Sequence, residues 1–358
     1  MKRHGNLFKK VTSISNIKEA IKIAAKNKHS RPDVQNVIMN IDAYASEIRK
    51  MLINGEFHTS EYKIHAIYEP KRRDIYVLPF YPDRIVHHCI MNILEPIFDS
   101  WFINDSYCCR AGKGSIAASD KCSKYVNNFK FCVQYDIKHY FPSINHDILM
   151  NIIERKIKDN KLLDLLSDII YSIDGPTNLP IGNHTSQWFG NLYLNELDQF
   201  VMHNLDKRFH NYIRYCDDFL FFVNTKEDAR YLHEVIPKFL HEKLQLSLSK
   251  AITQRTKQGV KFVGFRHFKK GKILLRKSTV KKQKKRLKSV KYELRHGAIT
   301  IEQARSVVAS IYGWMIHANT YNLRKSLKLD KLCDAFMELT LILIEYERNK
   351  NERIRKHE

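Results

Sequence analysis

The chain has 358 residues, 44% of them hydrophobic and 28% charged, so it is long enough for a large core and more than one domain. Lys and Arg number 61 against 38 Asp and Glu, and this net charge of +23 favours a polyanionic partner. Nucleic acid is favoured over a membrane, because no stretch reaches the roughly 18 apolar residues needed to span a bilayer.

Residues 1–49 are predicted to form a helical N-terminal extension, because Ile17, Ile21 and Ala24 recur at helical spacing. The first ten residues are basic but lack the apolar run of a secretory signal. The seven cysteines are odd in number and lack paired CxxC spacing, so we expect reduced, mostly buried thiols in a cytosolic protein. Histidine and cysteine spacings argue against a zinc site.

A first candidate strand lies in KFCVQYDIKHYFPSI, residues 130–144. It is apolar and aromatic through Tyr135 and places Asp136 where the strand is expected to end. Taken alone, Asp136 is compatible with an ordinary strand-end acid.

A strand–turn–strand is predicted in NYIRYCDDFLFFVN, residues 211–224, with the adjacent acids Asp217 and Asp218 between its strands. Two interpretations are open: a solvated turn, or a site where a divalent cation relieves the repulsion between carboxylates. The second gains weight from Asp136 about eighty residues earlier. Two Mg²⁺ ions held by Asp136 and Asp217 would suit phosphoryl transfer.

A basic helix is predicted in residues 278–296, with Ser278 or Thr279 as its N-cap. Its apolar residues form one narrow stripe, comprising Val280, Leu287, Val290 and Leu294. A solvated helix is one interpretation, but a run of cations without an acid favours contact with phosphates. That run comprises Lys281, Lys282, Lys284, Lys285, Arg286, Lys288 and Lys291.

Ordered segments of the chain resemble the motifs of reverse transcriptases. YCDD at 215–218 resembles their YxDD box, and YDIKHYFPSINH at 135–146 resembles their first palm motif. Further similar segments are PKRRDIYVLPFYPDRIVHHCIMNILEPIFDSWF (70–102), RAGKGSIAA (110–118), LPIGNHTSQW (179–188), LQLSLSK (244–250) and VKFVGF (260–265). The order and spacing of these segments hold over roughly residues 60 to 270.

The resemblance implies roles for individual residues. Asp136, Asp217 and Asp218 would be the catalytic and metal-binding acids, with two Mg²⁺ ions as cofactors. Phe141 would lie under the sugar of a dNTP and exclude a 2′-hydroxyl. Lys71 and Arg73 would hold oxygens of the triphosphate. Lys250 would lie near the leaving pyrophosphate and is a candidate general acid.

The segment 179–188 departs from the common pattern. Most reverse transcriptases place Gln at the position of Ile181 and Pro at that of Gln187. The pattern I-G-x-x-x-S-Q-W resembles the enzymes of diversity-generating retroelements, which miscopy template adenines. Ile181 lacks a polar group to position the nucleotide and is our candidate for low fidelity. We assign Ile181, Gly182 and Gln187 to the dNTP site, with Gly182 admitting the nucleotide close to the backbone.

The resemblance implies an α+β, right-hand polymerase fold. We expect fingers from residues 50–125 and 148–185, an antiparallel-sheet palm from 126–147 and 186–268, and a basic helical thumb from 269–358. The implied partners are template RNA, the RNA–cDNA duplex, dNTPs and a basic oligomeric accessory protein.

Two alternatives remain open. One is another single-domain bacterial reverse transcriptase, of retron, abortive-infection or intron-derived type. The other is a catalytically silent RNA-binding scaffold, against which the three acids argue, because clustered carboxylates repel phosphate.

Overall fold

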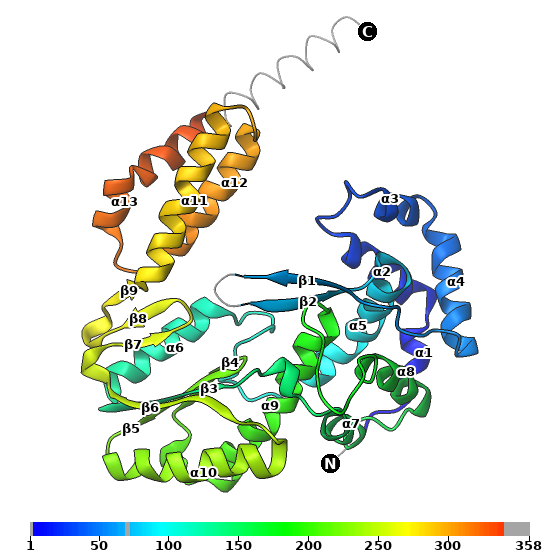
Figure 1. Cartoon of the computed structure of the whole chain (residues 1–358), viewed down its shortest axis with the longest axis horizontal. Coiled ribbons are helices and arrows are strands. Elements are labelled where there is room, and N and C mark those ends of the chain that lie inside the picture. Colours follow the sequence, from blue (N-terminus) through cyan, green and yellow to red (C-terminus); the bar gives the residue numbers. More distant parts are fainter. Residues whose placement is uncertain (1–2, 69–71, 340–358) are drawn as a thin grey trace, which may run out of the picture. The chain divides into compact units, whose positions relative to one another are not determined.

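The computed structural model of the chain describes residues 3–68 and 72–339. The chain divides into two compact units. The first combines Met1–Ala118 with Phe131–Thr253, and the second combines Ser119–Lys130 with Gln254–Glu358. Mixed helices and antiparallel sheets make up both units, as the sequence predicts for an α+β protein (Figure 1).

The first unit begins with helices that pack on one another and on α5 (Figure 1). Ile17, Ile21 and Ala24 are fully buried in α2, which confirms the helix predicted from their spacing. The side-chain amide of Asn16 donates to the Cys89 carbonyl of α5 at 2.9 Å. These helices are α1 (Phe8–Val11), α2 (Ile14–Ala25), α3 (Pro32–Met39), α4 (Ile41–Asn54) and α5 (Ile85–Asp99).

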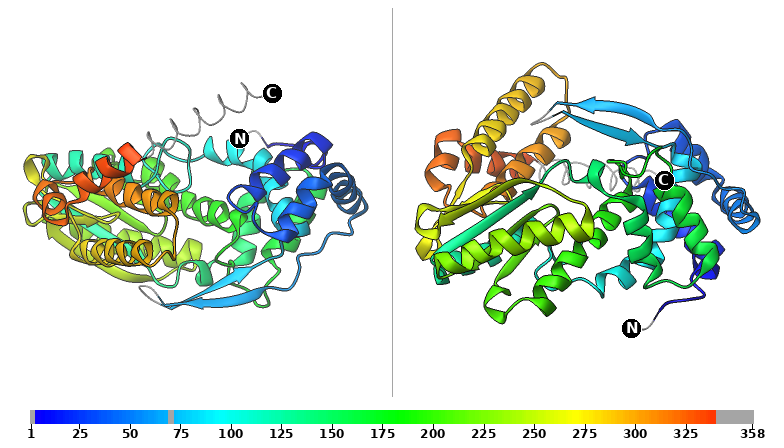
Figure 2. Two further views of the ribbon diagram at one scale, coloured as in Figure 1. Left: turned by 90° about the horizontal axis from the view of Figure 1, so that it is seen from above. Right: turned by 60° about the horizontal axis from the view of Figure 1, so that its bottom comes forward.

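A two-stranded hairpin, β1 (Lys63–Ile67) and β2 (Arg73–Val77), projects from this helical cluster (Figure 2). Every residue of β1 is exposed. Because two strands alone are marginal in water, the hairpin depends on contacts made elsewhere by β2.

The centre of the first unit is a four-stranded sheet in the order β4-β5-β3-β6, and β3–β5 and β4–β5 pair antiparallel. The strands are rich in aromatic and β-branched residues, which suit a pleated, covered surface. Phe219 to Val223 are buried without alternation, so both faces of β5 are covered. The four strands are β3 (Phe131–Ile137), β4 (Tyr212–Tyr215), β5 (Asp218–Val223) and β6 (Leu248–Arg255).

The long helix α10 packs on β3 and β5 and runs along the sheet in both Figure 1 and Figure 2. Helix α9 packs against α5, α7 and α10, and its Tyr193 hydroxyl donates to the Leu244 carbonyl at 2.7 Å. The helices of this layer are α7 (His146–Glu154), α8 (Asn160–Ile170), α9 (His184–Asn204) and α10 (Lys226–Leu244).

The second unit holds a three-stranded antiparallel sheet and a group of helices. Trp314 of α12 stacks on Phe265 of β8, with ring centroids 4.9 Å apart. The strands are β7 (Val260–Phe262), β8 (Phe265–His267) and β9 (Ile273–Leu275). The helices are α6 (Ser115–Asn128), which begins in the first unit, α11 (Lys277–Arg295), α12 (Ile301–Met315) and α13 (Tyr321–Leu327).

Two expectations need correction. Helix α11 begins at Lys277 after Arg276, so Ser278 and Thr279 lie inside its first turn and neither is the N-cap. The cysteines are free, but only Cys89, Cys122 and Cys132 are buried, so most of the seven thiols are half-buried instead.

In the described part of the chain, no helix combines the length and apolarity that crossing a bilayer requires.

Candidate active site

Two of the predicted acids face each other across neighbouring strands. Asp136 lies opposite Asp218 in the β3–β5 register, one residue before β3 ends. Like charges directly opposite in a sheet repel, so this pair needs compensation. The Gln134 amide, on the same face, donates to Asp218 Oδ1 at 2.9 Å, and the Ser249 hydroxyl of β6 donates to Asp136 Oδ2 at 2.7 Å.

The third acid, Asp217, lies in the turn between β4 and β5. We call this two-residue segment, Cys216 and Asp217, the Cys216–Asp217 turn. Cys216 adopts a left-handed backbone conformation with φ 55°, which reverses the chain after β4. Burial raises the pKa of the Asp217 carboxyl, and the charge of Asp136 raises this pKa further.

Arg73, at the start of β2, opposes that repulsion. Its positive charge acts to lower the pKa of the Asp217 carboxyl, but burial and the charge of Asp136 outweigh it and the pKa is raised. Its neighbour Arg72 instead forms an exposed ion pair with Asp74, with 3.5 Å between Nε and Oδ1. Lys71, also predicted to bind the triphosphate, lies outside the described residues.

The acids fit a hard divalent cation in their chemistry. The charge of Asp136 raises the pKa of the Asp217 carboxyl, so the two carboxylates repel each other. A cation bound between them would remove this repulsion. Over residues 3–68 and 72–339, no three Asp, Glu, His or Cys side chains gather into a complete metal site. Two carboxylates suffice for Mg²⁺ when substrate phosphates and water complete the coordination sphere.

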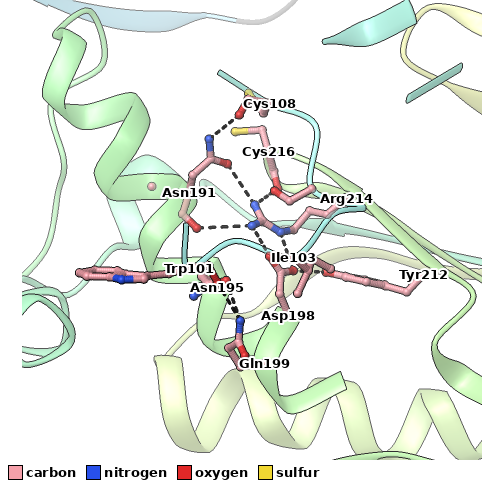
Figure 3. Close-up of polar contacts among 12 residues, drawn as sticks. Trp101, Ile103, Cys108, Asn191, Asn195, Asp198, Gln199, Tyr212, Arg214 and Cys216 are labelled. Carbon is pink, nitrogen blue, oxygen red and sulfur yellow. Dashed lines mark hydrogen bonds and ion pairs between the residues drawn. The ribbon is translucent and has the colours of Figure 1, made fainter. Parts of the chain in front are cut away.

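Beneath the Cys216–Asp217 turn lies a buried ion pair between Arg214 of β4 and Asp198 of α9 (Figure 3). Arg214 Nε donates to Asp198 Oδ1 at 2.8 Å, and Arg214 Nη2 donates to Asp198 Oδ2 at 2.5 Å. The Tyr212 hydroxyl also donates to Asp198 Oδ1, at 2.8 Å. Burial acts to lower the pKa of Arg214, but the charge and hydrogen bonds of Asp198 outweigh it and the pKa is raised.

The predicted nucleotide residues Ile181 and Gly182 contact the hairpin. The Tyr76 amide of β2 donates to the Ile181 carbonyl at 2.8 Å. Gly182 has φ 122°, and a Cβ atom there would come within 2.8 Å of the Tyr76 carbonyl oxygen. A glycine is therefore required at position 182 because the backbone there lies close to strand β2 of the protein itself. Strand β2 carries Arg73 at its start.

Phe141 begins the short helical turn Phe141–Ser143 after β3 and is half-buried. Gly190 of α9 admits it: a Cβ atom at Gly190 would lie 3.2 Å from Phe141 Cε1. The neighbouring Tyr140 ring packs edge-on against Phe141, and its hydroxyl donates to the Gly190 carbonyl. Phe141 thus packs between Tyr140 and Gly190 of α9.

Gln187 and Lys250 lie on different elements. Gln187, on the first turn of α9, is exposed and its side-chain oxygen is 3.3 Å from Cys109 Sγ. Lys250, in β6, directly follows the Ser249 that donates to Asp136. Strand β6 is the neighbour of β3 in the sheet, so Lys250 comes from the strand next to Asp136.

The basic cluster lies on α11 in the second unit. Leu287 and Val290 are buried, whereas Val280 and Leu294 are half-buried, so the predicted apolar stripe faces the protein. Six of the seven cations of the predicted run are exposed and Lys291 is half-buried; the exposed six are Lys281, Lys282, Lys284, Lys285, Arg286 and Lys288.

Sequence reasoning missed several residues that support the acids. Gln134 lies two positions before Asp136 in an otherwise apolar strand, a pattern that places both side chains on one face. Arg214 and Asp198 are charged residues inside apolar segments, and such charges are buried only with a partner. That rule could have paired them. Ser249 carried no comparable signal.

Comparison with known proteins assigns the sequence to a family. The family model described as "Reverse transcriptase (RNA-dependent DNA polymerase)" matches residues 70–267, which include all three acids, Arg73 and Lys250. The chain belongs to the reverse transcriptase family. The matched segment is more than half of the chain.

Relatives of this reverse transcriptase include intron-encoded proteins. The Group II intron-encoded protein LtrA of Lactococcus lactis subsp. cremoris is 24% identical over 258 residues, covering 52% of this chain and 43% of LtrA. The putative COX1/OXI3 intron 2 protein of Saccharomyces cerevisiae is 21% identical, covering 51% of this chain and 29% of that protein. Protein YkfC of Escherichia coli K12 is 23% identical over 316 residues, covering 74% of this chain and 83% of YkfC. The chain thus spans less than half the length of LtrA.

Proposed function

We propose that the chain is an RNA-directed DNA polymerase that extends a primer with dNTPs. The observation that carries the proposal is the register of β3 and β5, which sets Asp136 opposite Asp218, with Asp217 in the adjoining Cys216–Asp217 turn. Clustered carboxylates at that point suit the divalent ions that accompany a nucleoside triphosphate.

In this proposal Asp136 and Asp217 hold two Mg²⁺ ions, and Asp218 is the third acid beside the primer end. When bound, the ions lower the pKa of the primer hydroxyl and neutralise the leaving pyrophosphate. The Gln134 and Ser249 hydrogen bonds fix the directions of the Asp218 and Asp136 carboxylates.

Other residues bind and select the nucleotide. Arg73, together with Lys71 two positions earlier, binds triphosphate oxygens, for which a guanidinium offers bidentate donors. Phe141 lies under the sugar and excludes a 2′-hydroxyl, which selects dNTPs. Lys250 approaches the leaving pyrophosphate and can give it a proton.

We further propose the right-hand layout for this chain: fingers from 50–125 and 148–185, a palm from 126–147 and 186–268, a thumb from 269–358 and an N-terminal extension of 1–49. The exposed cations of α11 then bind the phosphates of the template–product duplex.

Primer extension on an RNA template with Mg²⁺ and dNTPs tests the polymerase proposal. The Asp217→Asn/Asp218→Asn variant is the control, since it removes two carboxylates with little change in shape. We expect extension by the wild type and none by the variant. Extension by neither protein, even with cognate RNA and accessory protein present, would favour the silent RNA-binding scaffold.

A finer proposal is that this polymerase belongs to a diversity-generating retroelement, with error-prone copying of template adenines. It is supported by Ile181 and Gln187, which replace the Gln and Pro of the common pattern. Its expected partners are a structured template RNA and a basic, oligomeric accessory protein. Sequencing of the extension products should show errors concentrated at template adenines.

The relatives favour a second candidate, an intron-derived or similar bacterial reverse transcriptase, because LtrA and the yeast protein are intron-encoded. The same sequencing experiment separates the two candidates. Accurate copying of adenine, unchanged by cognate RNA and accessory protein, would support the intron-type enzyme.

The Ile181→Gln variant tests the cause of low fidelity. We expect fewer errors opposite adenine, because an amide can again position the nucleotide and about 1.4 kcal/mol of discrimination is a tenfold change in error. An unchanged error frequency would show that Ile181 is not the cause.

A further inference from the structure

The ion pair of Arg214 and Asp198 has no part in the metal and nucleotide contacts proposed above. Both side chains are fully buried. A buried pair gives little net stability, because desolvation offsets the attraction and apolar residues of similar volume serve as well. Burial of this pair therefore calls for a role other than stability.

The other edge of the Arg214 guanidinium reaches the Cys216–Asp217 turn (Figure 3). Arg214 Nη1 donates to the Cys216 carbonyl at 3.3 Å and to Asn191 Oδ1 at 3.1 Å. Cys216 is the residue whose left-handed conformation directs the chain into Asp217. One planar group thus joins α9, through Asp198 and Asn191, to the backbone that carries the metal-binding acid.

The same residue also fixes the outer edge of β4. The Arg214 amide donates to the Asp105 carbonyl, and the Tyr107 amide donates to the Arg214 carbonyl, each at 3.0 Å. The Asn191 amide donates to the Cys108 carbonyl at 2.8 Å. Arg214 therefore has its main chain and its side chain fixed together, which limits movement of the residues that follow it.

We propose that Arg214 is a positioning residue for the polymerase reaction: paired with Asp198, it holds the Cys216 carbonyl so that Asp217 binds a divalent cation beside Asp136. This inference rests on the proposed polymerase function. Arg214 does not touch the cation and acts through the Cys216–Asp217 turn. Lysine cannot replace it, because an ammonium is a point charge and lacks the planar fork that reaches Asp198 and Cys216 at once.

The test compares Arg214→Lys with Tyr212→Phe. Tyr212→Phe removes a hydrogen bond to the same Asp198 oxygen but leaves the contact between Arg214 and Cys216 in place. Both variants should lower the melting temperature by a few degrees. Only Arg214→Lys should weaken Mn²⁺ binding, measured by electron paramagnetic resonance of free Mn²⁺, on the order of tenfold. The Mg²⁺ concentration for half-maximal primer extension should rise by the same factor.

The Asp217→Asn/Asp218→Asn variant keeps the two hypotheses apart. If wild type and this variant bind Mn²⁺ equally, the metal site of the proposed function is wrong. If wild type binds more tightly than this variant, but Arg214→Lys equals Tyr212→Phe in Mn²⁺ affinity, the polymerase stands and the positioning role is overturned. Should Arg214→Lys fail to fold, Asn191→Ala removes one Arg214 contact and should give a smaller loss of Mn²⁺ affinity. No loss there would also overturn the inference.

Discussion

The hydroxyl of Ser249 donates to the carboxylate of Asp136 over 2.7 Å, although the two residues lie 113 positions apart in the chain. Strand β6 is the neighbour of β3 in the sheet, and just past the end of β3 the Lys138 amide donates to the Ser247 carbonyl at 2.8 Å. One oxygen of Asp136 is thereby directed toward β6, which leaves the other for a ligand.

Ser249→Ala should raise the Mg²⁺ concentration for half-maximal primer extension by on the order of tenfold, because the hydrogen bond that orients Asp136, the proposed metal ligand, is lost. Stability should change by no more than about 0.5 kcal/mol, since Ser249 is exposed. The measurement is extension rate against Mg²⁺ concentration. Ser247→Ala, an exposed serine two residues earlier, is the control and should match wild type. An equal effect of both substitutions would rule out the hydrogen bond as the cause.

Gly182→Ala should raise the KM for dNTP. The new Cβ would meet the Tyr76 carbonyl at 2.8 Å and displace β2. Strand β2 carries Arg73, the residue proposed to bind the triphosphate, so dNTP binding should weaken. Steady-state extension against dNTP concentration measures the effect.

Gly175→Ala is a matched control for backbone strain. Gly175 also has a positive φ, of 102°, but a Cβ there meets nothing within 4 Å. Both substitutions should cost stability, about 1–3 kcal/mol for a residue strained in this way. Only Gly182→Ala should change KM. A rise in KM for both variants would mean that strain, and not displacement of the hairpin, is responsible.

Local patterns in the sequence predicted the elements that hold the acids. Aromatic and β-branched runs interrupted by Asp identified β3 and the β4–β5 hairpin, because strand preference and turn chemistry act over a few residues. The helical spacing of Ile17, Ile21 and Ala24 identified α2 for the same reason.

Contacts between distant segments could not be predicted in this way. The neighbour of Gly182 is Tyr76, more than a hundred positions earlier, and no local pattern links the two. Arg214 and Asp198 were visible as charges in apolar segments, but which partner each would take depends on how α9 packs under β4. The start of α11 was misplaced because Ser278 and Thr279 are good N-cap residues, yet the helix begins before them.

Lys284→Gln/Lys288→Gln should weaken nucleic-acid binding and reduce its salt dependence. The two side chains are one helical turn apart on α11, and both are exposed. If each contacts a phosphate, the slope of log K against log salt concentration should fall in magnitude by about 1.8, since each contact contributes about 0.9. Binding to an RNA–DNA duplex over a salt series measures this slope.

Lys226→Gln/Lys238→Gln is the control for that experiment. It removes the same charge from exposed positions of α10, in the other unit. General electrostatic attraction would be reduced alike by both double variants, whereas direct phosphate contact would be lost only from α11. Equal slopes for the two double variants would therefore contradict a specific role for the α11 cations.

The buried His87 should make the protein sensitive to acid. Burial lowers its pKa to about 3, with the charges of His184 and His88 acting in the same direction. An unfolded histidine has a pKa of about 6.5, so between pH 6.5 and 3 the unfolded state binds a proton that the folded state does not. The stability from this residue is complete above about pH 6.5 and is lost as the pH falls, by about 1.4 kcal/mol at pH 5.5.

The His87→Asn variant should therefore show a shallower fall in unfolding free energy between pH 7.5 and 5.5, measured by urea denaturation. The asparagine amide can still reach the Thr185 hydroxyl, which is 3.1 Å from His87 Nδ1. His29→Asn changes an exposed histidine and should leave the wild-type pH dependence in place. A pH dependence in His87→Asn as steep as that of wild type would assign the acid sensitivity to other groups, with His267, whose pKa burial lowers to about 4, as the next to replace.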